Sequence, residues 1–281
     1  MKLKITLGKH SGFCFGVRRA YDLTRVNSKD CSEVFILGKL VHNNDVCRDI
    51  YKRGIKEIKS LSDIKKGTVI FTAHGVGPGF YKKASIKGLK IIDTTCPKVM
   101  KVQRLAKSFA EKKYQVLVFG DKNHKEVKSI FEWSGRKAKV IGSLKDAEKL
   151  KYDQTKKYCL LSQTTQNVEK FKKVIAYFQK NLKNFAYFNT ICPSTNDRQK
   201  EVRNLARKND VVIVIGGKDS ANSRMLYEIS KKINKKSFFV ESGKEFKKKD
   251  LAGKTKIAIF TGASTPEWII KQIIGDLKKI V

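Results

Sequence analysis

The sequence predicts an α/β protein built from three similar units, each with a mainly parallel sheet. Apolar, β-branched runs alternate with helical patterns along the whole chain of 281 residues, and this alternation is typical of parallel strands joined by crossover helices. Two tracts also repeat, because residues 93–97 read DTTCP and residues 189–193 read NTICP, with their cysteines 96 residues apart. A third cysteine, Cys14, lies in a comparable strand-to-helix turn within residues 10–17.

The strands are predicted where short apolar runs lie between polar residues. Residues 1–7 read as a first strand, since their apolar run is too short for a signal peptide. The other clear strand candidates are Val34–Leu37, Val69–Thr72, Gln115–Phe119, Tyr158–Leu161, Val211–Ile215 and Lys256–Phe260. Helical patterns follow at 97–111, 124–133, 167–180, 195–208, 221–233 and 266–279. No apolar run approaches the ~18–20 residues of a membrane span, so we expect a cytoplasmic protein.

The residues that leave each strand form repeated series. Glycine-led turns recur at 38–43, 120–124 and 216–220, and hydroxyl-containing turns recur at 72–75, 162–165 and 261–264. We therefore predict three α/β domains in a pseudo-threefold trefoil, with the domains covering residues 14–96, 97–192, and 193–281 plus 1–13. Ligands of such sheets bind at the carboxyl ends of the strands, so these turns are expected to face a central cleft that contains a metal cluster.

The cysteines divide into two classes. None of the six forms a close pair in the sequence, which favours free or metal-bound thiols over a disulfide scaffold. Cys31, Cys47 and Cys159 lack a repeated context and are expected to be inert packing residues. Cys14, Cys96 and Cys192 each precede a helical pattern, and a helix N-terminus favours the thiolate that binds metal. Three convergent thiolates suit an iron–sulfur cluster with one open iron.

Three of the four histidines, His42, His74 and His124, lie just beyond apolar strands. Together with serines and asparagines at helix N-termini they form a set of donors that suits a diphosphate. Glu126 is the one carboxylate of these turns that the pattern offers as a proton source. A glutamate in a first helical turn also complements the helix dipole, so both interpretations of Glu126 stay open at this point.

The charge raises a different class of function. The chain carries 50 lysines and 11 arginines, with a formal net charge of +35 at pH 7. A lysine-rich nucleic-acid-binding protein with a structural metal is therefore one alternative. The lysines are scattered, however, and base and phosphate recognition favours arginine forks, so we expect no specific nucleic-acid partner. A hydrolytic zinc enzyme that uses histidine and Glu126 is a second alternative.

Many ordered motifs resemble one family, the LytB/IspH hydroxymethylbutenyl diphosphate reductases of the non-mevalonate isoprenoid pathway. The resemblance runs nearly end to end. It rests on residues 12–20, 41–43, 73–76, 93–97, 124–127, 162–165, 190–192, 198–199 and 262–264. The family fold is a trefoil of three α/β domains.

The resemblance implies a reductive dehydroxylation that yields isopentenyl and dimethylallyl diphosphate. It assigns the residues as follows: Cys14, Cys96 and Cys192 to one [4Fe–4S] cluster per chain, Glu126 to proton donation, and His42, His74, His124, Thr164, Ser220, Asn222 and Ser264 to the substrate. An external one-electron donor of the ferredoxin or flavodoxin type is also implied. Two positions depart from the family pattern, because Ala221 replaces a frequent serine and Ser194 a frequent alanine.

Overall fold

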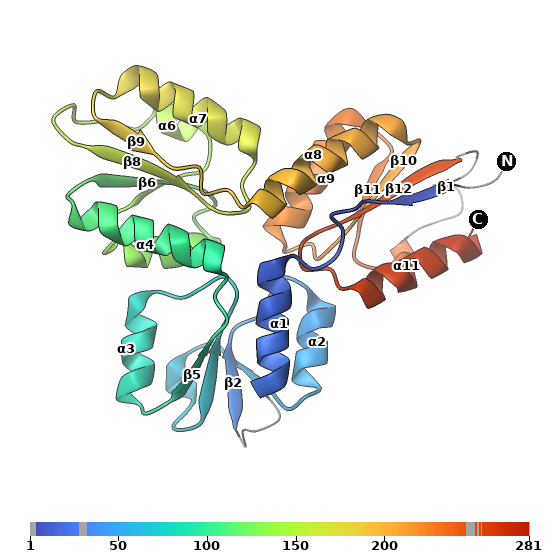
Figure 1. Ribbon diagram of the computed structural model, residues 1–281, viewed down its shortest axis with the longest axis horizontal. Coiled ribbons are helices and arrows are strands. Elements are labelled where there is room, and N and C mark those ends of the chain that lie inside the picture. The colour runs from blue at the N-terminus through green and yellow to red at the C-terminus, as the bar shows by residue number, and fades with distance from the viewer. Residues whose placement is uncertain (1–3, 28–32, 246–250, 252, 254, 281) are drawn as a thin grey trace. The chain divides into compact units, whose positions relative to one another are not determined.

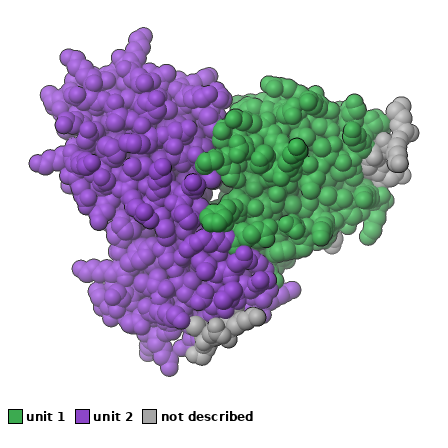
Figure 2. All heavy atoms as spheres, in the orientation of Figure 1, with its two compact units in different colours: residues 1–18, 41–49, 193–281 green, residues 19–40, 50–192 purple. Residues whose placement is uncertain are grey.

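Twelve strands form three parallel four-stranded sheets in the part of the chain that the computed structural model describes (Figure 1). The structure describes residues 4–27, 33–245, 251, 253 and 255–280. Two compact units divide the chain, one of residues 1–18, 41–49 and 193–281 and the other of residues 19–40 and 50–192 (Figure 2).

The first unit contains one sheet, in the order β1-β12-β10-β11. Its strands are β1 (Lys4–Leu7), β10 (Val211–Ile215), β11 (Ser237–Val240) and β12 (Lys256–Thr261). Its helices are α8 (Pro193–Lys208), α9 (Ala221–Ile233), the 3-10 turn η2 (Gly243–Glu245) and α11 (Glu267–Ile280). β1 pairs in parallel with β12 from Lys4↔Lys256 to Leu7↔Ile259, so the N-terminal strand joins the sheet of the C-terminal segment (Figure 1).

Alternation along β10 explains why helices cover both faces of this sheet. Val211, Ile213 and Ile215 pack in one core with α11, whereas Val212 and Val214 pack in another core with α8 and α9. Successive side chains of a strand point to opposite faces. A strand buried on both faces therefore needs a continuous run of apolar residues, and β10 is such a run.

The second unit contains two sheets, of which one has the order β3-β2-β4-β5. Its strands are β2 (Val34–Leu37), β3 (Lys56–Ile58), β4 (Thr68–Phe71) and β5 (Lys90–Asp93). The helical segments of this unit are most of α1 (Phe15–Asn27), the 3-10 turn η1 (Leu61–Asp63) and α3 (Pro78–Ile86), whereas most of α2 (Asn44–Tyr51) belongs to the first unit. Val69 and Phe71 of β4 pack with Ala84 of α3 in the core of this sheet.

The other sheet of the second unit has the order β7-β6-β8-β9. Its strands are β6 (Gln115–Phe119), β7 (Lys139–Ile141), β8 (Tyr158–Ser162) and β9 (Phe185–Tyr187), and its helices are α4 (Pro97–Glu111), α5 (Lys125–Trp133), α6 (Leu144–Glu148) and α7 (Val168–Asn181). Leu117 and Phe119 pack against Phe171 on one face. Val116 and Val118 pack with α4 and α5 on the opposite face.

The prediction of an α/β chain with three similar parallel sheets is confirmed, and the seven predicted strands and six predicted helices all occur. Short outer strands were missed, namely β3, β5, β7, β9 and β11, as were the helices α2, α3 and α6, whereas α1 is the helix expected after Cys14. The domain boundaries at residues 96 and 192 stay a prediction. Residues 1–3 of the predicted first strand lie outside the described residues.

No helix among the described residues combines the length and the apolar character that crossing a membrane requires.

Glycines at the strand ends let helix N-termini approach the sheets closely. Gly38, Gly120 and Gly216 follow β2, β6 and β10, and each donates its backbone N–H to the last residue of the adjacent outer strand at 2.9–3.0 Å. A Cβ on Gly216 would lie 2.8 Å from the Cβ of Ser223 on α9. Rotation of the Ser223 hydroxyl therefore does not relieve the clash, and α9 depends on glycine at this position.

We expect Gly216→Ala to lower the free energy of unfolding by about 1–3 kcal/mol, the usual cost of overpacking. Gly275→Ala is the matched control, because a Cβ at Gly275 in α11 meets nothing within 4 Å and alanine favours a helix by about 0.5–1 kcal/mol. Urea unfolding of both variants measures the difference. A Gly216→Ala protein as stable as the wild type contradicts the close approach of α9.

Candidate functional site

Each of the three repeated cysteines is fixed to its sheet by the same backbone hydrogen bond. The N–H of Cys14 donates to the carbonyl of Ala263 at 3.1 Å within the first unit. In the second unit, Cys96 donates to Ala73 at 3.1 Å and Cys192 donates to Thr164 at 2.9 Å. All three acceptors lie two residues beyond the last residue of β12, β4 or β8. The three turns are thus structurally equivalent, as the repeats in the sequence indicated.

Side-chain contacts explain why DTTCP and NTICP repeat. Asp93 and Asn189 each accept a hydrogen bond from the N–H two residues later, at 2.9 and 3.2 Å, which is an Asx-turn. The hydroxyls of Thr94 and Thr190 each donate at 2.6 Å to the carbonyl at the end of the neighbouring strand. The proline that follows each cysteine is the first residue of its helix, where no N–H is needed.

The Cys14 turn is held differently, by α8. Buried Arg198 donates a hydrogen bond to the carbonyl of Gly12 at 3.0 Å. The carboxylate of Glu201 accepts the backbone N–H groups of Lys9 and His10 at 2.5 and 2.9 Å, and it contacts Nδ1 of His10 at 2.7 Å. The N–H of Gly12 donates to the hydroxyl of Thr261 at 2.7 Å. The helix that begins directly after Cys192 therefore also fixes the turn of Cys14.

Burial separates the cysteines into the two predicted classes. Cys14, Cys96 and Cys192 are partly exposed at the starts of α1, α4 and α8, whereas Cys47 and Cys159 are buried. Burial raises the pKa of the Cys159 thiol to about 12, so this thiol stays protonated. Cys31 lies outside the described residues. Accessible thiols at helix N-termini suit thiolate ligation, so the residues present fit an iron–sulfur group.

Glu126 is a buried acid held by a single residue. The N–H of Thr164 donates to its Oε1 at 2.6 Å, and the hydroxyl of Thr164 donates to Oε2 at 2.9 Å. The side chain is buried, and this burial raises the pKa of Glu126 to about 7, although the two hydrogen bonds from Thr164 oppose the rise. A carboxyl with this pKa exchanges its proton near neutral pH.

His124 caps α5, the helix that carries Glu126. Its Nδ1 accepts a hydrogen bond from the N–H of Glu126 at 3.2 Å. An accepting Nδ1 carries no proton, so the neutral ring bears its proton on Nε2. The ring of His74 contacts that of His124 edge to face at 5.5 Å between centroids. The second unit therefore brings His74, His124, Glu126 and Thr164 to one region.

The first unit brings together the other predicted substrate residues around the N-terminus of α9. The hydroxyl of Ser264 donates to the carbonyl of His42 at 3.3 Å, and a Cβ on Gly217 would lie 2.5 Å from that carbonyl. Ser220 caps α9 through the N–H of Ser223 at 3.3 Å. Within the described residues, neither Oδ1 nor Nδ2 of buried Asn222 has a hydrogen-bond partner. Because buried amides normally have hydrogen-bond partners, an amide without them indicates a place where a polar ligand binds.

Sequence reasoning missed Glu201 and assigned no role to Arg198, and it placed Asn43 among the diphosphate donors at helix N-termini. Asn43 accepts the N–H groups of Asp45 and Val46 at 3.0 and 3.1 Å and so caps α2, as His124 and Ser220 cap α5 and α9. The recurrence of Asn, His and Ser at the same distance from a strand was the available signal. The roles assigned to the site residues stay predictions.

We expect Glu126→Gln to gain stability relative to the wild type as pH rises from about 4.5 to about 7. Both folded and unfolded wild-type chains are protonated at Glu126 below this range. Within the range the unfolded carboxyl ionises while the folded one keeps its proton, so the wild type loses stability with rising pH. Urea unfolding of both proteins across pH 4–8 measures the difference. A difference independent of pH contradicts the raised pKa.

The comparisons with known proteins agree on one family. The model of the LytB protein family matches residues 5–278. A 4-hydroxy-3-methylbut-2-enyl diphosphate reductase of Clostridium perfringens is 38% identical over 287 residues, which cover 100% of both chains. The solved structure of the E-1-hydroxy-2-methyl-but-2-enyl-4-diphosphate reductase from Plasmodium falciparum has a TM-score of 0.93 at 27% identity, covering 98% of this chain and 88% of that one. A second solved reductase structure, described as the terminal enzyme of the non-mevalonate pathway, has a TM-score of 0.72 at 35% identity and 99% coverage of both chains. The chain belongs to the LytB family.

Proposed function

We propose that this chain is a 4-hydroxy-3-methylbut-2-enyl diphosphate reductase, which catalyses the last step of the non-mevalonate pathway to isoprenoid precursors. The reaction removes the allylic hydroxyl as water and consumes two electrons and two protons. Its products are isopentenyl diphosphate and dimethylallyl diphosphate. The family membership and the names of the relatives support this assignment.

The hydrogen bonds of Thr164 are the observation that best supports the proposal. Its N–H and hydroxyl hold Glu126, while its carbonyl accepts the N–H of Cys192. One residue thus joins a buried acid to a cysteine turn. A reductive dehydroxylation needs this combination, because a proton must reach the leaving oxygen close to the source of electrons.

Glu126 donates the proton that leaves with the hydroxyl. Its pKa of about 7 keeps a large fraction of the carboxyl protonated at neutral pH. The hydroxyl of Thr164 can accept a hydrogen bond from the acid or donate one to the carboxylate, so their contact at 2.9 Å persists in both protonation states. Thr164 therefore positions the proton before and after transfer.

The substrate diphosphate is bound by hydrogen-bond donors at helix N-termini. Nε2–H of His124, the hydroxyls of Ser220 and Ser264, and the amide of Asn222 supply such donors, with His42 and His74 completing the set. Helix N-termini attract phosphate oxygens through their exposed N–H groups.

Cys14, Cys96 and Cys192 would hold one [4Fe–4S] cluster per chain, with three thiolate ligands. Such a cluster supplies electrons and a Lewis-acidic iron for the C–O bond. We infer an external donor of the ferredoxin or flavodoxin type, and the formal charge of +35 favours an acidic carrier. Six cysteines without close pairs suit a reducing compartment, so we place the enzyme in the cytoplasm.

Glu126→Gln is expected to keep its iron and to lower turnover by about 10²–10⁴-fold, the usual scale of general acid catalysis. Glu169→Gln is the matched control, because Glu169 is the second residue of α7 as Glu126 is of α5, yet it is exposed. Anaerobic turnover with dithionite and a mediator measures both variants. Full turnover in Glu126→Gln removes this residue from the mechanism.

Cys96→Ser is expected to lose stable cluster assembly, because its turn would present a hydroxyl in place of a thiolate. Cys47→Ala is the control and should retain the wild-type iron content, since Cys47 is buried on α2 with its Sγ directed to the carbonyl of Val41 at 3.5 Å. Iron and sulfide analysis after anaerobic purification gives the result. Four irons per chain in Cys96→Ser would refute its role as a ligand.

A further inference from the structure

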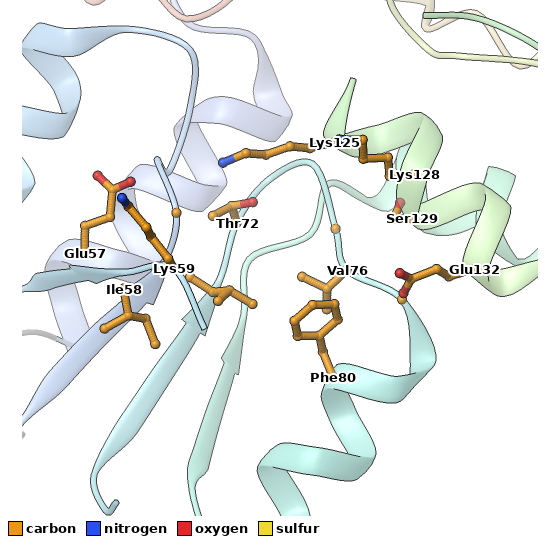
Figure 3. A pocket seen from close by; sticks show the side chains of 14 residues that line it. Glu57, Ile58, Lys59, Thr72, Val76, Phe80, Lys125, Lys128, Ser129 and Glu132 are labelled. Carbon is orange, nitrogen blue, oxygen red and sulfur yellow. The ribbon is translucent and has the colours of Figure 1, made fainter. Parts of the chain in front are cut away.

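The second unit contains an open pocket of about 380 Å³ at the carboxyl ends of β2, β3 and β4 (Figure 3). Its walls come from these strand ends, from α3 and from one face of α5. The α5 residues in the wall are Lys125, Lys128, Ser129 and Glu132, which follow the spacing of one helix face. None of the residues assigned above to the substrate or the metal lines this pocket.

The pocket lies where sheets of this type bind ligands. The chain leaves β2 towards β3 on one side, and it leaves β4 towards β5 on the other side. The connections therefore diverge between β2 and β4, which pair with each other. Ligands of open α/β sheets bind at this switch point, outside the carboxyl ends of the strands.

The sheet of β6 and β7 also has an open pocket at its strand ends, of about 700 Å³ and lined by Gly120, Val140, Gly142 and Lys170 among others. The pockets differ directly beside the glycine that follows the strand, where side chains fill the space in the other two sheets. A Cβ on Gly120 would lie 2.7 Å from Val127 and 3.0 Å from Gln163, and a Cβ on Gly216 would lie 2.8 Å from the Cβ of Ser223. Among the described residues, a Cβ on Gly38 would meet only the flexible end of Lys125, with its Nζ at 2.6 Å. The side chain of Lys125 extends from α5 across the pocket above Thr72 (Figure 3).

The pocket has an excess of positive charge. Lys59, Lys125 and Lys128 line it, and among the described residues no ion pair joins Lys59 or Lys128 to an acid. Both carboxylates of the wall have partners elsewhere. Glu57 accepts the hydroxyl of Tyr51, and Glu132 packs on the N-cap of α3 and lies 3.9 Å from the guanidinium of Arg136.

The rest of the wall is apolar. Leu37, Ile58, Val76 and Phe80 form it, and Val76 and Phe80 lie below the lysines of α5 in Figure 3. The volume is near the lower limit of small-molecule pockets, about 300–1,000 Å³. A matching ligand is a small molecule with an anionic head and a short apolar tail.

We propose that this pocket is a second binding site for a short branched-chain diphosphate, the chemical class of substrate and products in the proposed function, on which the choice of ligand rests. The lysines bind the diphosphate, and the apolar wall contacts the hydrocarbon. Lys125 directly precedes Glu126 on α5, so a ligand bound here contacts the helix that carries the proton donor. The site thus gives the products a route to influence the reaction.

Calorimetric titration of the anaerobic holoenzyme with isopentenyl diphosphate tests the proposal. We expect two molecules per chain for the wild type and one for Lys59→Glu/Lys128→Glu. Lys173→Glu/Lys180→Glu on the exposed face of α7 makes the same change in net charge and should keep both sites. Lys59→Ala alone is expected to weaken the second site about tenfold, the scale of one hydrogen bond to a charged group. One molecule per wild-type chain, or two in the double pocket variant, overturns the proposal.

Two further ligands test the charged part and the apolar part of the pocket separately. Inorganic diphosphate should bind the second site at least tenfold more weakly than isopentenyl diphosphate, and 3-methylbut-3-en-1-ol should not bind it. Equal affinity for inorganic diphosphate overturns the apolar contribution. A wild-type crystal soaked with isopentenyl diphosphate provides a measurement that needs no variant: a phosphate beside Lys59 or Lys128 supports the site, and an occupied reaction site with an empty pocket overturns it. Turnover of the allylic substrate is measured separately, so failure of the proposed function is distinguishable from failure of the second site.

Discussion

One backbone hydrogen bond, used three times, governs the candidate site. The N–H of each repeated cysteine donates to a carbonyl two residues beyond the end of the adjacent strand. This places every such thiol at a helix start and next to a strand-end turn that carries polar residues. The sheets thus determine both what positions the sulfur and what lies beside it. At Thr164 this arrangement joins the cysteine turn to the buried acid.

The fold was predictable where a strand is buried on both faces. All five residues of β10 are buried, as are all five of β8, and such continuous apolar runs are evident in a sequence. β3 reads KEI and β7 reads KVI, and each begins with an exposed lysine. A strand of three residues is too short to show the alternation of apolar and polar residues that identifies a strand in a sequence. These strands form because a central strand pairs with them, and that pairing is a tertiary interaction.

The site was predictable to the extent that it repeats. The cysteine turns and the polar strand ends recur at the level of single residues, so their equivalence was visible before any coordinates. The contacts that hold the Cys14 turn were not visible in the sequence, because Arg198 and Glu201 bind residues that are 186 to 192 positions away from them along the chain. The pKa of Glu126 was equally hidden, since it depends on burial that arises from packing α5 on its sheet.

The second residues of the equivalent helices α2, α5 and α9 show how burial changes the properties of a side chain at this position. Asp45 of α2 is partly exposed and forms an ion pair with Arg48. Asn222 of α9 is buried, but an amide has no proton to give at neutral pH. Glu126 of α5 alone combines a carboxyl group with burial. Asp45 has contact with water and with its arginine, whereas the ionised form of Glu126 lacks water, and this raises the pKa of Glu126 to about 7. The same backbone position therefore carries a surface ion pair in α2, a buried amide in α9 and a buried acid in α5, and the surrounding packing sets the burial of each.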